Sequence, residues 1–186
     1  MNVSRLCEWE IIGRDKDENI IHYYKSPNLQ VDTGKAASLN WIGGLSNIAA
    51  SGFTFLGYGP SSFTAAVTDT GLGGISGGVG YEYIGNPGGR PAITNWVQTA
   101  ENYVYSGLTF TQKLTGSITI NGSTDPNANS IGAPIQSFAL FNTYTLPSAP
   151  NLLSGVMFNE LVDATQFLLK NGVDFNTLSV TIVLRE

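Results

Sequence analysis

The sequence contains one cysteine, one histidine and few charged residues, and each shortage excludes a class of protein. Cys7 alone cannot supply an internal disulfide or a multi-cysteine metal site. His22 alone excludes zinc sites built from two or three histidines, and it leaves a Ser-His-Asp arrangement with one possible base. Charged residues make up 12% of the chain, where about 25% is usual. These shortages favour binding or assembly over catalysis, so we expect a non-enzymatic protein without a cofactor.

Basic stretches and long apolar runs are missing as well. The net charge is −5 and the pI is about 4.7, which argues against a nucleic-acid partner because such binding depends on neutralising phosphates. No apolar run approaches the roughly 18 residues of a membrane span. The first ten residues lack the basic start and apolar centre of a signal peptide. We therefore expect no nucleic-acid or membrane partner, and folding in a reducing cytoplasm.

Small polar residues and glycine carry most of the remaining sequence. Gly, Thr, Ser and Asn together account for 71 of the 186 residues, and 22 of these are Gly. Short segments with alternating apolar residues recur between turn signals, which is typical of antiparallel sandwiches and barrels. We predict a mainly β fold, an antiparallel β-sandwich of jelly-roll or immunoglobulin-like type, with one or two short helices.

The first segment predicts a β-hairpin. Cys7, Trp9 and Ile11 alternate with other side chains, a charged turn follows, and Ile20–Tyr24 resumes the strand pattern. A lone hairpin is only marginally stable, so it must pack on the body or on another subunit. We place it in an N-terminal arm, residues 1–27, ahead of a sandwich domain, residues 28–186. Deleting the arm is expected to leave a folded body that no longer assembles.

Further elements follow from composition and periodicity. A short helix is expected over residues 34–42, after the capping residues Asp32 and Thr33 and before a Gly-Gly pair. Residues 161–170 also permit a short helix. Strands are predicted over residues 53–59, 79–84, 92–98, 102–113, 114–121, 134–144, 152–158 and 178–184.

The order of these features resembles a known group of proteins. Asn28–Lys35 precedes a short helix, Leu56-Gly57-Tyr58-Gly59 lies in a strand, and Ala66–Leu72 ends a loop. Phe138–Asn142, the segment Leu152–Phe158 and a terminal apolar strand follow. This layout resembles small β-sandwich virion proteins of tailed bacteriophages over roughly residues 28–185. Such proteins lie on the capsid as decoration or cement proteins, or on the tail and neck as accessory proteins.

The resemblance implies a place in the virion and a set of partners. We expect a protein that binds the assembled capsid shell, with the major capsid protein or another virion protein as its partner. We also expect a symmetric oligomer, most plausibly a homotrimer, because a capsid offers threefold positions. A tail, neck or fibre accessory protein and a carbohydrate-binding module for a host receptor are the alternatives.

Aromatic and apolar pairs on single strand faces are the candidate contact residues. Paired rings on one strand face form either a core, a subunit interface or a sugar-binding platform. The sugar alternative would use the exposed rings of Tyr81, Tyr83, Trp96, Tyr103 and Tyr105. The interface residues that we predict are Trp9, Ile11, Ile21, Tyr23, Tyr81, Tyr83, Tyr103 and Tyr105.

The acidic residues give no strong site. Glu8 and Glu10 share a strand face about 7 Å apart, within the range of glycosidase carboxylates, but charge on an edge strand is also a common guard against aggregation. The Asp15–Asn19 turn lacks the glycine and glutamate of a calcium loop. Glu160 and Asp163 are interpreted as a solvated helix start. We therefore predict no catalytic residue and no metal site.

Overall fold

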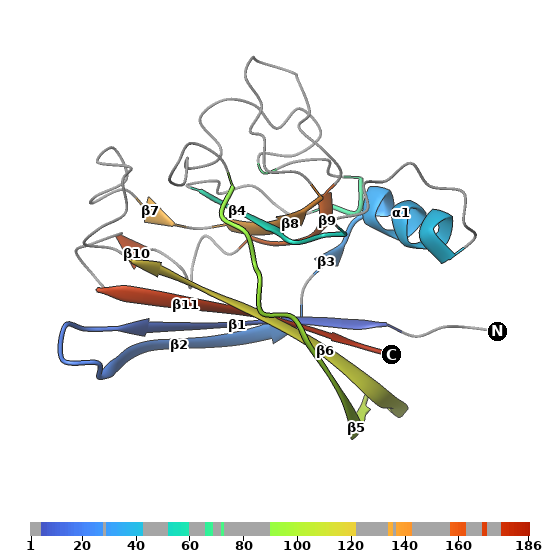
Figure 1. The fold of residues 1–186 in the computed structure, drawn as a ribbon, viewed down its shortest axis with the longest axis horizontal. Coiled ribbons are helices and arrows are strands. Elements are labelled where there is room, and N and C mark those ends of the chain that lie inside the picture. The colour runs from blue at the N-terminus through green and yellow to red at the C-terminus, as the bar shows by residue number, and fades with distance from the viewer. Residues whose placement is uncertain are drawn as a thin grey trace, which may run out of the picture.

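The computed structural model describes part of the chain: residues 5–27, 29–42, 52–59, 66–68, 72, 90–121, 134–135, 137–142, 157–162, 169–170 and 176–186. Within these ranges the fold is mainly β, with antiparallel sheets and a single helix. Figure 1 shows the two larger sheets as two layers, one above the other.

The larger sheet has five strands in the order β2-β1-β11-β6-β5. Each neighbouring pair is antiparallel. The first and last strands of the described chain lie side by side in its interior, where Trp9 is opposite Ile182. The strands are β1 (Leu6–Arg14), β2 (Ile20–Pro27), β5 (Val97–Tyr105), β6 (Leu108–Asn121) and β11 (Thr177–Arg185).

The second sheet has four antiparallel strands in the order β3-β9-β8-β4, and two two-residue strands form a separate small sheet beside β4. Helix α1 (Asp32–Ile42) packs along β9. The strands are β3 (Leu29–Gln30), β4 (Phe55–Gly59), β8 (Ser137–Phe141) and β9 (Met157–Val162), with β7 (Pro134–Ile135) and β10 (Leu169–Lys170) forming the short pair.

The two larger sheets bury side chains in one shared core. Trp9 of β1 and Phe138 of β8 belong to the same cluster, with ring centroids 6.0 Å apart. Alternate residues of β1 and β11 point into this core, because side chains on a strand alternate between its two faces. The core also takes Leu56 and Tyr58 from β4. Burial of this apolar surface is the main stabilising term that the fold provides.

Strand β8 is buried on both faces. Phe138 and Leu140 lie in the shared core, whereas Ala139 and Phe141 lie in a second cluster with Val31, which precedes α1. Residues 138–141 lie within the segment 134–144 for which the sequence predicts a strand, and neighbouring side chains of a strand point to opposite faces. The four-stranded sheet therefore has apolar contacts on the face away from the five-stranded sheet as well.

The hairpin at the N-terminal end was predicted correctly, but its place in the fold was not. Residues 1–27 were expected to form an arm outside the 28–186 domain. Instead β1 pairs with β11 along its whole length, and Trp9 and Ile11 lie in the shared core. The physical reason is that the backbone N–H and C=O groups of β11 on the side opposite β6 are paired only when β1 lies beside it. The hairpin is thus part of the five-stranded sheet.

Two further predictions need correction, and others lie outside the described residues. The stretch 102–113 is not one strand, because the turn at Ser106-Gly107 divides it into the end of β5 and the start of β6. Glu160 lies in strand β9 and not at a helix start, since residues 157–162 pair with β8. The predicted strand over 79–84, with Tyr81 and Tyr83, lies outside the described residues, as does Asp163.

Candidate functional site

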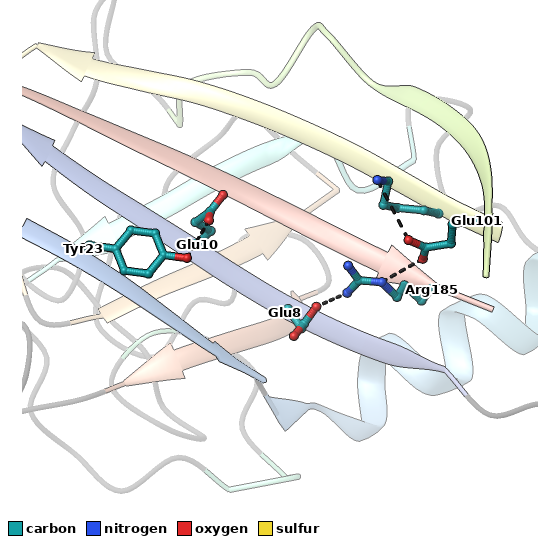
Figure 2. Close-up of polar contacts among 6 residues, drawn as sticks. Glu8, Glu10, Tyr23, Glu101 and Arg185 are labelled. Atoms are coloured by element: carbon teal, nitrogen blue, oxygen red, sulfur yellow. Dashed lines mark hydrogen bonds and ion pairs between the residues drawn. The ribbon is translucent and has the colours of Figure 1, made fainter. Parts of the chain in front are cut away.

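A cluster of charged and aromatic side chains lies on the outer face of the five-stranded sheet, the face opposite the shared core. Glu8 of β1, Arg185 of β11 and Glu101 of β5 converge there from three strands (Figure 2). We call these three residues, with Tyr103 and Lys113, the Arg185 cluster. Side chains on a strand alternate between its two faces. Glu8 and Arg185 follow Cys7 and Leu184, which contact the shared core, so their own side chains lie on the outer face.

Arg185 is the centre of the cluster. Its side chain is 7% exposed, it donates a hydrogen bond to Glu8, and its Nε lies 2.7 Å from a carboxylate oxygen of Glu101. Lys113 adds a longer ion pair to Glu101, at 3.9 Å. Burial lowers the pKa of the Arg185 guanidinium from its usual value. The two carboxylates offset this burial, since a buried charge is tolerated only when it is paired.

Aromatic rings close the cluster on the side of the β5–β6 hairpin. The guanidinium carbon of Arg185 lies 4.1 Å from the centroid of the Tyr103 ring, and the centroids of Tyr103 and Phe110 are 6.4 Å apart. The amides of both Thr111 and Gln112 donate to the carbonyl of Glu186. Two residues opposite one is the pattern of a β-bulge. Phe110 lies directly opposite Tyr103 on the neighbouring strand, so the two rings share one face of the sheet.

Glu8 and Glu10, the carboxylate pair noted in the sequence, have separate structural partners. Glu8 binds the buried Arg185, whereas Glu10 accepts a hydrogen bond of 2.9 Å from the Tyr23 hydroxyl (Figure 2). That hydrogen bond raises the pKa of Tyr23. Both carboxylates therefore join neighbouring strands, and this observation favours a structural role for the pair.

The remaining polar positions noted in the sequence also have local structural roles. The Asp15 carboxylate accepts hydrogen bonds from the backbone amides of Asp17 and Asn19, so it forms the turn between β1 and β2. The side-chain hydrogen bond from Asn19 lowers the pKa of Asp15. His22 packs closely over Gly13, and Cys7 is buried in the shared core.

Exposed apolar side chains gather at the two edges of the five-stranded sheet. Of eight large apolar side chains exposed among the described residues, seven lie on β2 or on the β5–β6 hairpin. On β2 they are Ile20, Ile21 and Tyr23, and on the hairpin they are Val97, Val104, Tyr105 and Leu108, while Val67 lies elsewhere. We call these two groups the β2 edge and the β5 edge. Contiguous exposed apolar patches, in contrast to single exposed residues, are typical of contact sites.

The structure separates the predicted interface residues into three groups. Trp9 and Ile11 are fully buried in the shared core, so the prediction of a surface role for them is wrong. Ile21, Tyr23 and Tyr105 are exposed on the two edges, and Tyr103 is half-buried in the Arg185 cluster. Tyr81 and Tyr83 lie outside the described residues.

Sequence reasoning missed Val97, Val104 and Leu108, and it missed the pairing of Glu8 with Arg185. The Ser-Gly dipeptide at 106–107 is a turn signal that would have revealed the hairpin and with it the exposed apolar residues near its tip. No local pattern reveals an ion pair between residues 177 positions apart.

Trp96 is packed against the sheet and does not form an open platform. A Cβ atom at position 116 would lie 2.6 Å from Cε3 of the Trp96 ring, so Gly116 is the residue that admits the ring. Trp96 also contacts the shared core. An aromatic ring over a strand glycine compensates for the side chain that glycine lacks.

Substituting Gly116→Ala is therefore expected to displace the Trp96 ring and to destabilise the fold by about 1–3 kcal/mol, the usual cost of overpacking. Tryptophan fluorescence should change with it, and chemical denaturation measures the loss. Thr119→Ala, at an exposed position of the same strand, is the matched control and should leave both readouts nearly unchanged. Equal effects of the two substitutions would contradict this assignment of Gly116.

The described residues contain neither a group of metal-binding side chains nor a helix that could cross a membrane. Among them, no three His, Cys, Asp or Glu side chains are grouped closely enough to hold a metal ion. The described part of the chain has no helix that is both long enough and apolar enough to cross a membrane. Comparisons of the chain with protein-family models, curated proteins and solved structures give no match.

Proposed function

We propose that this chain is a non-enzymatic structural protein of a tailed-bacteriophage virion, a decoration protein that binds the assembled capsid shell and stabilises it. The two sheets with their shared core would be the layers of an antiparallel β-sandwich, of jelly-roll or immunoglobulin-like type. The observation that carries the proposal is the gathering of exposed apolar side chains on the β2 and β5 edges.

The polar groups support an assembly role in a second way. Glu8 and Glu101 both form ion pairs with Arg185 from neighbouring strands, so the charged groups of the outer face serve the stability of the sheet. The exposed apolar surface, in contrast, contributes little to the core of the chain, because these side chains lie at the edges of the sheet, although the Tyr23 hydroxyl bonds to Glu10. Covering such residues with a partner lowers the free energy of the complex, because apolar surface is removed from water.

The physical mechanism of stabilisation would be mass action. A protein that binds only the assembled shell lowers the free energy of that shell relative to its dissociated subunits. In this proposal the β2 edge contacts the major capsid protein or another virion protein through the side chains of Ile20, Ile21 and Tyr23. The protein acts as a symmetric oligomer, with no nucleic-acid or membrane partner.

Co-sedimentation with capsid shells that lack this protein tests the proposal. We expect saturable binding at a fixed copy number per capsomer and a higher melting temperature of the shell. Ile21→Asp should weaken binding, because it places a charge on the β2 edge. Val67→Asp is the matched control, since Val67 is 41% exposed and Ile21 is 42% exposed, but Val67 lies outside both edges.

The outcomes separate the alternatives. Absence of binding to shells would contradict the decoration role, and binding to isolated tails would then favour a tail or neck accessory protein. Quenching of tryptophan fluorescence by sugars would favour the carbohydrate-binding alternative. The stacking of Tyr103 on Arg185 argues against that alternative, because one face of this ring is already in use.

A further inference from the structure

The two edges of the five-stranded sheet differ in how they are protected against pairing with another strand. The β2 edge carries Lys25 and Pro27, and β1 beside it has an irregular register at Gly13/Arg14. A lysine, a proline and a bulge are the usual devices that prevent strand addition at an edge. The β5 edge strand, Val97–Tyr105, also has a register shift, between Ala100 and Tyr103, but it contains no lysine and no proline. Its one charged residue, Glu101, is engaged by Arg185.

The turn of the β5–β6 hairpin determines which backbone groups of β5 face outwards. Ser106 and Gly107 both have positive φ, 51° and 79°, which together with the two-residue loop identifies a type I′ turn. Tyr105 and Leu108 flank this turn and form a hydrogen-bonded pair. Hydrogen-bonded and non-hydrogen-bonded pairs alternate along a hairpin, so the N–H and C=O of Val104 point away from β6, towards the open edge.

We propose that β5 is the strand through which two copies of this chain pair, antiparallel and about a two-fold axis at Val104, so that one sheet continues across both copies. The backbone groups of Val104 would then bond to those of Val104 of the partner subunit. Val104 is the most exposed large apolar side chain among the described residues, at 64%. This pairing covers it with its own symmetry mate.

The symmetry of the sheet favours a second copy as the occupant. Two identical edge strands that pair antiparallel, with the outer faces of both sheets on the same side, are related by a two-fold axis, which gives a closed and self-complementary contact. With the axis at Val104, Tyr103 lies opposite Tyr105 of the partner subunit, and the same pair recurs across the axis. Such cross-strand aromatic pairs are favourable.

Charge supports the same choice. Each copy carries a net charge of −5, so two copies repel one another unless they meet where charge is absent. Residues 102–112 are such a place. Glu101 lies in the irregular part of β5, between Ala100 and Tyr103, and its carboxylate pairs with Arg185 of its own chain, so the two Glu101 carboxylates do not meet on the axis. An uncharged strand on an anionic protein therefore fits a second copy of itself.

The proposed β5 contact goes beyond the proposed function. The contact itself is argued from the structure alone, and only its biological role in a virion rests on the proposed function. The β5 contact has two-fold symmetry and predicts a dimer, whereas the resemblance to phage proteins implies a homotrimer. Its test measures the mass of the protein alone, so failure of shell binding and failure of the β5 contact are distinguishable.

The mass of the 186-residue chain in solution, measured by light scattering or sedimentation equilibrium, is expected to be that of a dimer. Val104→Lys should raise the dissociation constant by about 100-fold, because two like charges meet on the axis. Val67→Lys, at an exposed position outside both edges, should leave the dimer intact. A monomeric or trimeric mass would overturn the proposal. So would dissociation by Ile20→Lys on the β2 edge in place of Val104→Lys.

A cysteine substitution tests the register directly. Val104→Cys places two thiols across the axis, at a Cα separation of about 5.5 Å that a disulfide can span. Oxidised glutathione, which accepts the two electrons and two protons, should convert this variant to a covalent dimer on a non-reducing gel. Val97→Cys is the matched control, because Val97 lies on the same strand but far from the axis. Cross-linking at 97 and not at 104 would overturn the register.

Discussion

Removal of residues 1–27 is expected to prevent the remaining chain from folding. Strand β1 lies between β2 and β11, and its Trp9 and Ile11 side chains are almost completely inaccessible to solvent. Replacing a single buried tryptophan by alanine lowers the free energy of unfolding by about 3–5 kcal/mol. A typical domain has a total free energy of unfolding of about 5–15 kcal/mol. The deletion also leaves one edge of β11 unpaired and uncovers Phe138.

Circular dichroism and thermal unfolding of the fragment 28–186 measure this effect. We expect loss of the cooperative transition that the full chain shows. Trp9→Ala in the full chain is the graded variant and should lower the free energy of unfolding by about 3–5 kcal/mol. Tyr23→Ala, at an exposed position of the same hairpin, is the control and should have a much smaller effect. A fragment that unfolds cooperatively would instead support an independent arm.

Substituting Arg185→Ala is expected to lower the free energy of unfolding by about 3–5 kcal/mol, the usual cost of breaking a buried ion pair from one side. The loss leaves the Glu8 carboxylate, whose side chain is 6% exposed, without the guanidinium that pairs with it. It also removes the group on which Tyr103 stacks and to which Glu101 pairs. We therefore expect the base of the β5–β6 hairpin to loosen together with the sheet.

Chemical denaturation with a matched ion pair distinguishes burial from charge. Arg5 pairs with Glu186 at a more exposed site, so Arg5→Ala should cost less than about 1 kcal/mol. The double substitution Glu8→Leu with Arg185→Leu should recover part of the loss, because it removes the Glu8 charge together with its partner, while Glu101 keeps its ion pair with Lys113. If Arg185→Ala and Arg5→Ala have the same effect, the Arg185 cluster does not carry the stability assigned to it.

Several elements could be predicted because their signals are local. The alternation of Cys7, Trp9 and Ile11 predicted a strand with these side chains on one face, and in the structure that face lies in the shared core. The helix before the Gly-Gly pair and a strand within residues 134–144 were confirmed in the same way. Each of these signals depends on the period of a side chain along one element. The charged turn between the strands of the hairpin has the same local origin.

The candidate site could be predicted only in part. Ile21, Tyr23 and Tyr105 were identified from the sequence and are exposed at the edges. Trp9 and Ile11 were assigned to the same surface because an apolar strand face looks alike whether it meets a core or another subunit. Periodicity tells which residues share a face of a strand, but it does not tell what covers that face.

The sequence by itself determined the mainly β class of the fold, the hairpin and which residues of β1 share a strand face, since these depend on composition and on the alternation of neighbouring residues. Only the tertiary structure decided that the first and last described strands pair, that Arg185 meets Glu8 and Glu101, and that the β2 and β5 strands are the edges. The physical reason is that strand pairing joins residues far apart in the chain, and its partner is selected by the packing of the whole core.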